Sequence, residues 1–153
     1  MLGSMIAALL VGAWFALDSA MAPIFGSAPN KNPEIQAALV HAAENAGVGG
    51  TVSLADVEPG PWDTVYIWDG YTADREHVVF PKVDFGDGGY GTDYVIAFSS
   101  AGDLVAWVRF NINDPLVYFD PPGAGIRASR DAAVFAVTRH PDFPDTKFLL
   151  LLK

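Results

Sequence analysis

The first 25 residues form an almost uninterrupted apolar stretch, in which the only charged residue between Leu2 and Phe25 is Asp18. As an α-helix rising about 1.5 Å per residue, this stretch would reach roughly 36 Å, which is longer than a hydrocarbon core of about 30 Å. The pattern therefore predicts a membrane anchor over residues 1–25, with lipid contact through residues 2–25.

Two other interpretations of this segment stay open. A cleaved signal peptide would use the apolar run as its core and Ala20-Met21-Ala22 as its small-x-small cleavage motif. Pro23 after the cut, and the absence of Lys or Arg ahead of the run, argue against it. A helix buried within the fold is the other interpretation. An anchor and a signal peptide both address the chain to a membrane.

A polar linker over residues 26–32 leads into a segment whose apolar residues recur every three or four positions. This spacing predicts an amphipathic helix over Pro33–Ala46, with Asn32 as its N-cap and Gly47 as its C-terminal stop. His41 lies beside the apolar face, and we expect it to be partly exposed. The apolar face is narrow and suited to close packing on a sheet; it comprises Ile35, Ala38, Leu39, Ala42 and Ala46.

Apolar and polar residues alternate along much of the remaining chain, which predicts β-strands. The predicted strands are Thr51–Val57, Trp62–Trp68, Tyr94–Ser99, Leu104–Phe110, Ala132–Thr138 and Lys147–Leu152. Ser100–Asp103 predicts the turn of a hairpin, and Thr72 is expected to cap a short helix over Ala73–Val79. The leucines of the last strand favour a central position with both faces buried.

Helices separated from a run of strands are typical of an α+β fold. We expect the helices to pack on one face of a mostly antiparallel sheet of about five strands. Residues 33–153 would form one domain, because their number suits a single hydrophobic core.

The segment WDTVYIWDGYT, Trp62–Thr72, is rich in aromatic and acidic side chains. Strand alternation predicts two faces, with Trp62, Thr64, Tyr66 and Trp68 on one and Asp63, Val65 and Ile67 on the other. The aromatic face suits either a helix-covered core or a binding site. The candidate ligand-binding residues of this region are Trp62, Asp63, Trp68, Asp69, Tyr71 and Tyr90.

Charge and composition narrow the function classes. The net charge is −9, and none of the nine Lys and Arg residues precedes Lys31. Because there is no basic cluster, neither nucleic acid nor an anionic lipid surface is an expected partner. The chain has no cysteine, which excludes disulfides, thiolate metal sites and a lipid-modified cysteine.

Catalytic and cofactor motifs are missing from the sequence. No serine lies in a Gly-x-Ser-x-Gly elbow, no glycine run carries the lysine of a P-loop, and no H-E-x-x-H motif is present. The remaining metal candidate is calcium, bound by carboxylates of a glycine-rich segment: Asp84, Asp87 and Asp93. Their spacing departs from that of an EF-hand loop, so we expect no cofactor, with calcium as the alternative.

Two segments, TVSLADVEPGPWDTVYIWDGYT and VIAFSSAGDLVAWVRF, resemble a group of small uncharacterised bacterial envelope proteins, many of them lipoproteins. The shared core is a WD-x-VY-[IV] strand, a PYT turn, a helix and a strand hairpin. The matching residues are Trp62, Asp63, Val65, Tyr66, Ile67, Tyr71 and Thr72. Gly70 stands where the group usually has proline, and the lipid-anchoring cysteine is absent.

The resemblance implies an exported α+β domain and no particular activity. It also implies a structural role for the motif itself. Trp62 and Tyr66 would fill the core, Asp63 would accept hydrogen bonds from backbone amides of the turn, and Thr72 would cap the helix.

Three functions stay open. The first is a membrane-tethered or exported non-catalytic domain of the bacterial cell envelope that binds another protein, for instance within a larger membrane complex. Small residues would let the apolar segment pack closely on a partner helix: Gly3, Ser4, Ala7, Ala8, Gly12 and Ala13. The second is an exported ligand-binding domain or small hydrolase that uses residues 62–94. The third is an acidic inhibitor or immunity-type protein that covers a basic partner.

Overall fold

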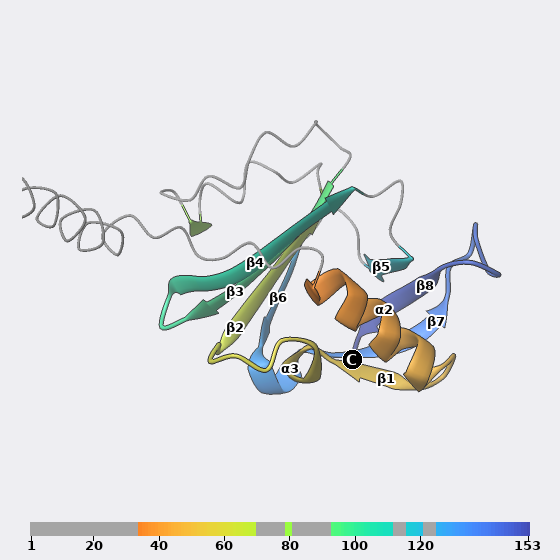
Figure 1. The fold of residues 1–153 in the computed structure, drawn as a ribbon, viewed down its shortest axis with the longest axis horizontal. Coiled ribbons are helices and arrows are strands. Elements are labelled where there is room, and N and C mark those ends of the chain that lie inside the picture. Colours follow the sequence, from red (N-terminus) through yellow and green to blue (C-terminus); the bar gives the residue numbers. More distant parts are fainter. Residues whose placement is uncertain (1–33, 70–78, 81–92, 112–115, 121–124) are drawn as a thin grey trace, which may run out of the picture.

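The structure, a computed structural model, describes residues 34–69, 79–80, 93–111, 116–120 and 125–153 (Figure 1). Their strands form two four-stranded sheets. The first sheet has the order β4-β3-β2-β6, with β2 Thr64–Asp69, β3 Asp93–Ser100, β4 Asp103–Asn111 and β6 Ile126–Ser129. The second has the order β1-β7-β8-β5, with β1 Thr51–Ser53, β5 Val117–Asp120, β7 Val134–Arg139 and β8 Phe148–Leu152.

The α+β class and the mostly antiparallel pairing are confirmed, but the prediction of a single sheet is wrong. Within the described residues, the one parallel pair is β5 with β8. The first sheet is completed by β6, a strand that the sequence pattern did not predict. It pairs with β2 from Thr64↔Ser129 to Ile67↔Ile126. Its alternation of buried and exposed residues is only four residues long, too short to stand out beside the preceding glycine-rich loop.

A corner carries the chain from the first sheet into the second. The corner is a 3₁₀ helix, η2 (Arg130–Ala132), which directly follows β6. The strand predicted over Ala132–Thr138 therefore begins later, at Val134. The chain changes sheets here, and residues that precede and follow η2, such as Ala128 and Phe135, belong to one core.

The first described helix, α2 (Glu34–Ala46), confirms the predicted amphipathic helix. It contacts β1 and β5 of the second sheet and β4 of the first, so it spans the opening between the sheets (Figure 1). Its buried residues are Ile35, Leu39 and Ala43. Gly47 ends the helix with a φ of 64°, a left-handed conformation that glycine adopts without steric cost. The main core lies between α2 and the inner faces of the two sheets.

The predicted hairpin of β3 and β4 is confirmed, with its turn at the expected residues. Ala101 and Gly102 have φ angles of 52° and 89°. Consecutive residues with positive φ are typical of type I′ turns, whose twist matches that of the flanking strands. Alanine is an unfavourable residue for this conformation, so the turn needs an external support.

The predicted strand Thr51–Val57 is wrong in its second half, which forms a short helix, α3 (Leu54–Val57). The hydroxyl oxygen of Ser53 accepts a hydrogen bond from the amide of Ala55 at 3.3 Å and caps this helix. Leu54 and Val57 are both buried. Residues three apart lie on one face of a helix but on opposite faces of a strand, so helix formation buries both in the same core.

The last strand, β8, is central in its sheet, as predicted, but it is not buried on both faces. Leu150 is fully buried, whereas Leu152 is 39 % exposed. Leu149 and Leu151, which point to the opposite face, are partly exposed. Within the described residues, α2 covers one face of this sheet, and the outer face carries partly exposed leucines.

Two predicted helices fall outside these descriptions. The apolar segment over residues 1–25 lies outside the described residues, as does nearly all of the helix predicted over Ala73–Val79 together with its cap, Thr72. Among the helices that are described, none is long and apolar enough to cross a bilayer.

Candidate functional site

The Trp-Asp pair of the aromatic segment precedes β2 and does not belong to it. Asp63 lies in a bend, where its amide donates to the carbonyl of Ser99 and its carbonyl accepts from the amide of Arg130. Trp62 is 4 % exposed and packs edge-on against Phe98 in the main core, with ring centroids 5.1 Å apart. Tyr66 and Trp68 belong to a second cluster on the other face of the first sheet. The predicted common face for Trp62, Tyr66 and Trp68 is therefore wrong, because the bend breaks the alternation.

Arg130 holds the loop that carries Trp62. Its guanidinium lies over the indole ring, 4.7 Å from the centroid. It donates hydrogen bonds to the carbonyl oxygens of Gly60 at 2.6 Å, Trp62 at 3.3 Å and Pro59 at 3.4 Å. The indole N–H in turn donates to the carbonyl of Glu58 at 2.6 Å. We call Glu58–Asp63 together with Arg130 the Trp62 corner; its polar groups bond to one another and tie the two sheets together.

Asp63 supports the strained hairpin turn. Its carboxylate accepts hydrogen bonds from the amide of Ala101 at 2.6 Å and from the hydroxyl of Thr64 at 2.8 Å. These two bonds, the Ala101 amide first, hold the pKa of the Asp63 carboxyl below its usual value. The Asp63 carboxylate thus accepts a hydrogen bond from an amide in the turn of the β3–β4 hairpin. This bond fixes Ala101, the residue with the unfavourable positive φ.

The second aromatic cluster lies on the outer face of the first sheet. Tyr66 and Trp68 stack at 5.6 Å, and Phe80 meets them edge-on at 5.5 and 6.3 Å. Arg127 lies over the Tyr66 ring, 5.7 Å from its centroid. Trp68 is only 4 % exposed. The rings in this cluster therefore pack on each other, which limits the access of a ligand to Trp68.

The remaining predicted site residues are only partly placed. Asp69 ends β2 and Asp93 begins β3; Asp69 pairs with Tyr94, so the two aspartates lie at neighbouring ends of paired strands. Their side chains, and the whole of Tyr71, Tyr90, Asp84 and Asp87, lie outside what the structure describes. The ligand and calcium assignments stay predictions. Within the described part of the chain, no three His, Asp or Glu residues are grouped as metal ligands would be.

A cluster that the sequence did not suggest lies where β7 and β8 join. The phenol of Tyr118, on β5, accepts a hydrogen bond from the Lys147 ammonium at 3.0 Å. The same ammonium lies 5.0 Å from the Tyr118 ring centroid and 4.4 Å from that of Phe143. His140 lies between these rings, 4.7 Å from Tyr118 and 5.3 Å from Phe143. The pattern was not detectable locally, because Tyr118 is distant in sequence from the other three residues.

Phe143 of this cluster is one of three large apolar residues that are exposed at this end of the second sheet. Val48 is 55 % exposed, Phe143 47 % and Leu116 45 %. The amide of Phe148 donates to the Leu116 carbonyl, and Val48 precedes the residues that pair with Val137. These bonds, and the position of Phe143 between β7 and β8, place all three residues at one end of the second sheet. We call this end the hairpin-end surface; its members are Val48, Leu116, Tyr118, Arg139, His140, Phe143, Lys147 and Phe148.

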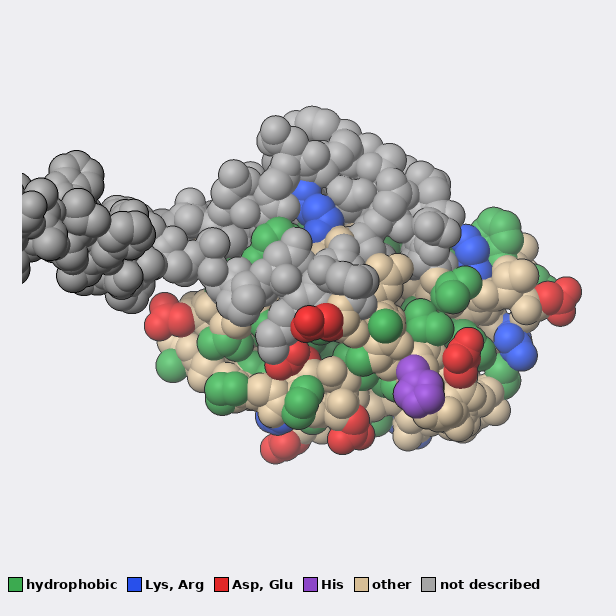
Figure 2. Space-filling model, in the orientation of Figure 1, with side chains coloured by type: hydrophobic (Ala, Val, Ile, Leu, Met, Phe, Trp, Pro, Cys, Tyr) green, Lys and Arg blue, Asp and Glu red, His purple; other side chains and the backbone are tan. Residues whose placement is uncertain are grey.

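The cations of the hairpin-end surface lie against aromatic rings. Arg139 lies over Phe148 at 5.1 Å. Lys147 contacts the two rings and the phenol described above, and no carboxylate pairs with either cation in the described part of the chain. Figure 2 shows basic, acidic and hydrophobic side chains gathered at the end of the molecule where β7 and β8 project, on the right. Such a surface can offer both a positive charge and apolar area to a partner.

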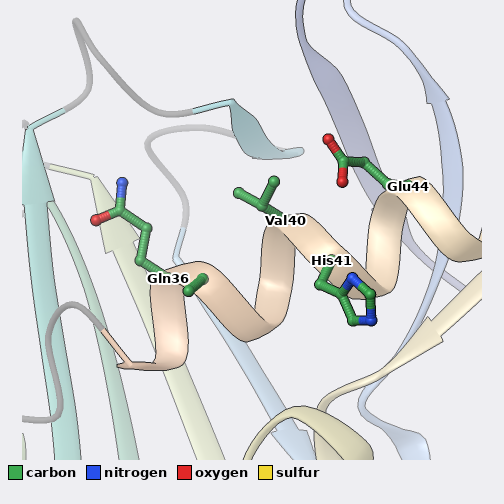
Figure 3. Close-up of a pocket in the computed structure, with 5 residues that line it drawn as sticks. Gln36, Val40, His41 and Glu44 are labelled. Atoms are coloured by element: carbon green, nitrogen blue, oxygen red, sulfur yellow. The ribbon is translucent and has the colours of Figure 1, made fainter.

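A shallow pocket of about 340 Å³ lies along α2, lined by Gln36, Ala37, Val40, His41 and Glu44 (Figure 3). His41 is exposed, as expected, and its Nε2 is 2.9 Å from the side-chain nitrogen Nδ2 of Asn45. In Figure 3 the His41 ring points away from Val40 and Glu44. The pocket therefore lacks convergent polar groups of the kind that catalysis needs.

Comparisons with protein-family models, with curated proteins and with solved structures found no match to this chain. The geometry of the described residues is therefore the basis for assigning a role.

Proposed function

We propose that this chain is a non-catalytic domain that binds another protein through the hairpin-end surface. The supporting observation is the exposure of Phe143, 47 %, beside a lysine that has ring faces for neighbours. Aromatic residues are enriched where interfaces concentrate their binding energy, and clustered exposed apolar residues mark interaction sites. Val48 and Leu116, which are 55 % and 45 % exposed, lie at the same end of the second sheet.

The polar groups beside the aromatic segment also support a non-catalytic role, because they bond within the fold. The carboxylate of Asp63 accepts hydrogen bonds from Ala101 and Thr64, and Arg130 donates to backbone carbonyls. A general acid, a general base or an oxyanion donor must have a polar group available to the substrate. These groups are engaged within the fold, so they serve stability.

The proposal places the domain at a membrane. It rests on the apolar residues 2–25 and on the resemblance of the Trp62–Thr72 motif to envelope proteins. Residues 26–33, at no more than roughly 3.5 Å each, would hold α2 within about 28 Å of the end of an anchor. A partner within that distance is most simply another component of a membrane complex. Intact-mass measurement on protein from the membrane fraction should give the full-length mass, and a mass lacking the first 22 residues would contradict the anchor.

Photo-cross-linking tests the contact surface. A photoreactive residue in place of Phe143 should give a discrete adduct in intact cells, identifiable by mass spectrometry. The matched control is the same residue in place of Asp131, which is exposed at the opposite end of β7. Equal adducts from both positions, or none from position 143, would refute the hairpin-end surface as the contact.

A further inference from the structure

The two sheets differ in how their outer faces are covered. On the first sheet, the outward residues Val95 and Ala97 are 1 % and 0 % exposed, in the second aromatic cluster that includes Phe80. On the second sheet, the outward residues of β7 and β8, its two central strands, stay partly exposed. Within the described residues, the second sheet therefore has α2 on its inner face and an outer face of partly exposed side chains.

The outer face of the second sheet carries almost no charge. Residues that pair directly in neighbouring strands point to the same face, so the register identifies its members. One row across the sheet contains, in order, Thr51, Ala136, Leu151 and Asp120. Asp120 is the only charged residue among the outward residues of these four strands, in a chain of net charge −9. Two copies of an acidic chain repel each other least where such a face meets its own copy.

The relief of this face also suits a second copy. Leu149 and Leu151 of β8 project as a ridge. Their direct partners on β7 are the smaller Thr138 and Ala136. A two-fold interface must be complementary to itself, so a ridge needs a hollow on the same surface. Here the ridge and the hollow lie on the adjacent central strands of the order β1-β7-β8-β5.

We propose that two copies of this chain pack the outer faces of their second sheets together. A two-fold axis parallel to the strands, between β7 and β8, places β8 of each copy over β7 of the other, and β1 over β5. Each Leu151 then packs on Ala136 of the partner copy. Asp120 meets the partner copy's Thr51, which is exposed and whose hydroxyl can donate a hydrogen bond. Sheets stacked in this way lie about 10 Å apart, as in a β-sandwich.

The area of the face predicts a reversible dimer. Four strands about 4.8 Å apart and five residues of about 3.4 Å each give a face of roughly 19 by 17 Å, or about 320 Å² of projected area per copy. Stable complexes bury about 800 Å² per partner, so this dimer should dissociate on dilution. Because the axis is parallel to the strands, the two hairpin-end surfaces lie at the same end of the dimer and would engage a partner together. That last consequence rests on the proposed function, whereas the dimer does not.

Engineered thiols test the arrangement without background, because the chain has no cysteine. Full-length Ala136→Cys and Leu151→Cys chains are mixed in detergent micelles and treated with a short bis-maleimide. The product should have twice the chain mass and contain a peptide pair that joins position 136 to position 151. The matched control uses Leu152→Cys in place of Leu151→Cys. Leu152 is the next residue and is 39 % exposed, but it points to the inner face, so a 136–152 pair should be far less abundant.

Sedimentation of the full-length chain in density-matched detergent measures the association. The mean mass of the natural chain should rise from one chain toward two as the concentration increases. Leu151→Gln should weaken the dimer at least about tenfold, because the two-fold symmetry removes two leucine contacts for each substitution. Leu152→Gln is the matched control and should dimerise like the natural chain. Circular dichroism of both variants establishes that they fold.

Four results would overturn the proposal. They are a single-chain mass at every concentration, equal association of the natural chain and Leu151→Gln, a 136–152 pair as abundant as the 136–151 pair, and a product with another protein in place of the doubled chain when the reaction is run on membranes. The adduct from position 143 bears only on the proposed function. A dimer without that adduct would support this inference and refute the hairpin-end contact, whereas that adduct from a chain that stays monomeric would do the reverse.

Discussion

Two regions of this molecule each place a cation over an aromatic ring, but the two pairs serve different purposes. In the Trp62 corner, Arg130 lies over a ring that is 4 % exposed and donates three hydrogen bonds to backbone carbonyls. At the hairpin-end surface, Lys147 lies over a Phe143 ring that is 47 % exposed and donates one hydrogen bond, to a phenol.

The difference lies in how much of each pair the fold covers. A cation–π pair that is removed from water gains up to about 2 kcal/mol, whereas an exposed pair gains about 0.5–1 kcal/mol. The corner therefore uses its pair to join two sheets. The hairpin end leaves nearly half of the Phe143 ring in water, where a partner can complete the burial.

The largest expected difference in stability is between removing the Trp62 ring and removing the Phe143 ring. Trp62→Ala should lower the free energy of unfolding by about 3–5 kcal/mol, because it deletes a buried side chain and leaves a cavity between the sheets. Phe143→Ala should lower it by less than about 1 kcal/mol, because nearly half of that ring is already in water. Urea unfolding of both variants would check this, and equal losses would contradict the comparison.

The two arginines provide the next contrast. Arg130→Ala should cost about 2–3 kcal/mol, since it removes charge-assisted hydrogen bonds and leaves the Gly60 and Trp62 carbonyls without that donor. Arg139→Ala, which removes an exposed cation over Phe148, should cost less than about 1 kcal/mol. The same urea experiment applies; a larger loss for Arg139→Ala would show that the hairpin end stabilises the fold.

Two serines precede helices, and only one of them makes a side-chain capping bond, so they separate the effect of the bond from the effect of position. Ser53→Ala should cost about 1 kcal/mol, because its hydroxyl oxygen accepts from the Ala55 amide at the start of α3. Ser129→Ala should have almost no effect, because Ser129 makes no side-chain capping bond to η2. Thermal unfolding followed by circular dichroism would detect this difference, and it would be disproved by equal melting temperatures for the two variants.

The smallest effect concerns pH. The pKa of Asp63 is lowered in the folded state by the Ala101 amide and the Thr64 hydroxyl. A lowered folded-state pKa means that Asp63 contributes stability above its unfolded value, 3.8, and loses it as the pH falls through the folded value. Asp63→Asn should therefore reduce the acid dependence of stability below about pH 5.

Asp103→Asn is the matched control for Asp63, since Asp103 lies on the other side of the same hairpin turn. Urea unfolding between pH 3 and 7 would give the slopes. An unchanged slope in Asp63→Asn, or the same change in both variants, would mean that the Ala101 contact does not govern the acid response.

Some elements could be predicted because their signals are local. The spacing of Ile35 and Leu39 and the glycine at position 47 suffice for α2. The Ser100–Asp103 turn suffices for the β3–β4 hairpin, since its residues are adjacent in sequence. Prediction failed where local signals compete. Leu54 and Val57 suit a strand by composition, but Ser53 caps a helix there, and the helix buries Leu54 and Val57 in one core.

What the sequence by itself determined is the α+β class, α2, the β3–β4 hairpin and the acidic, cysteine-free composition. The tertiary structure decided that there are two sheets, that Trp62 and Trp68 pack on opposite faces of one of them, and that Tyr118 meets His140, Phe143 and Lys147. The physical reason is the separation along the sequence over which each interaction acts. Periodicity and capping act between residues a few positions apart, whereas strand pairing and ring contacts join residues whose proximity is set by the whole chain.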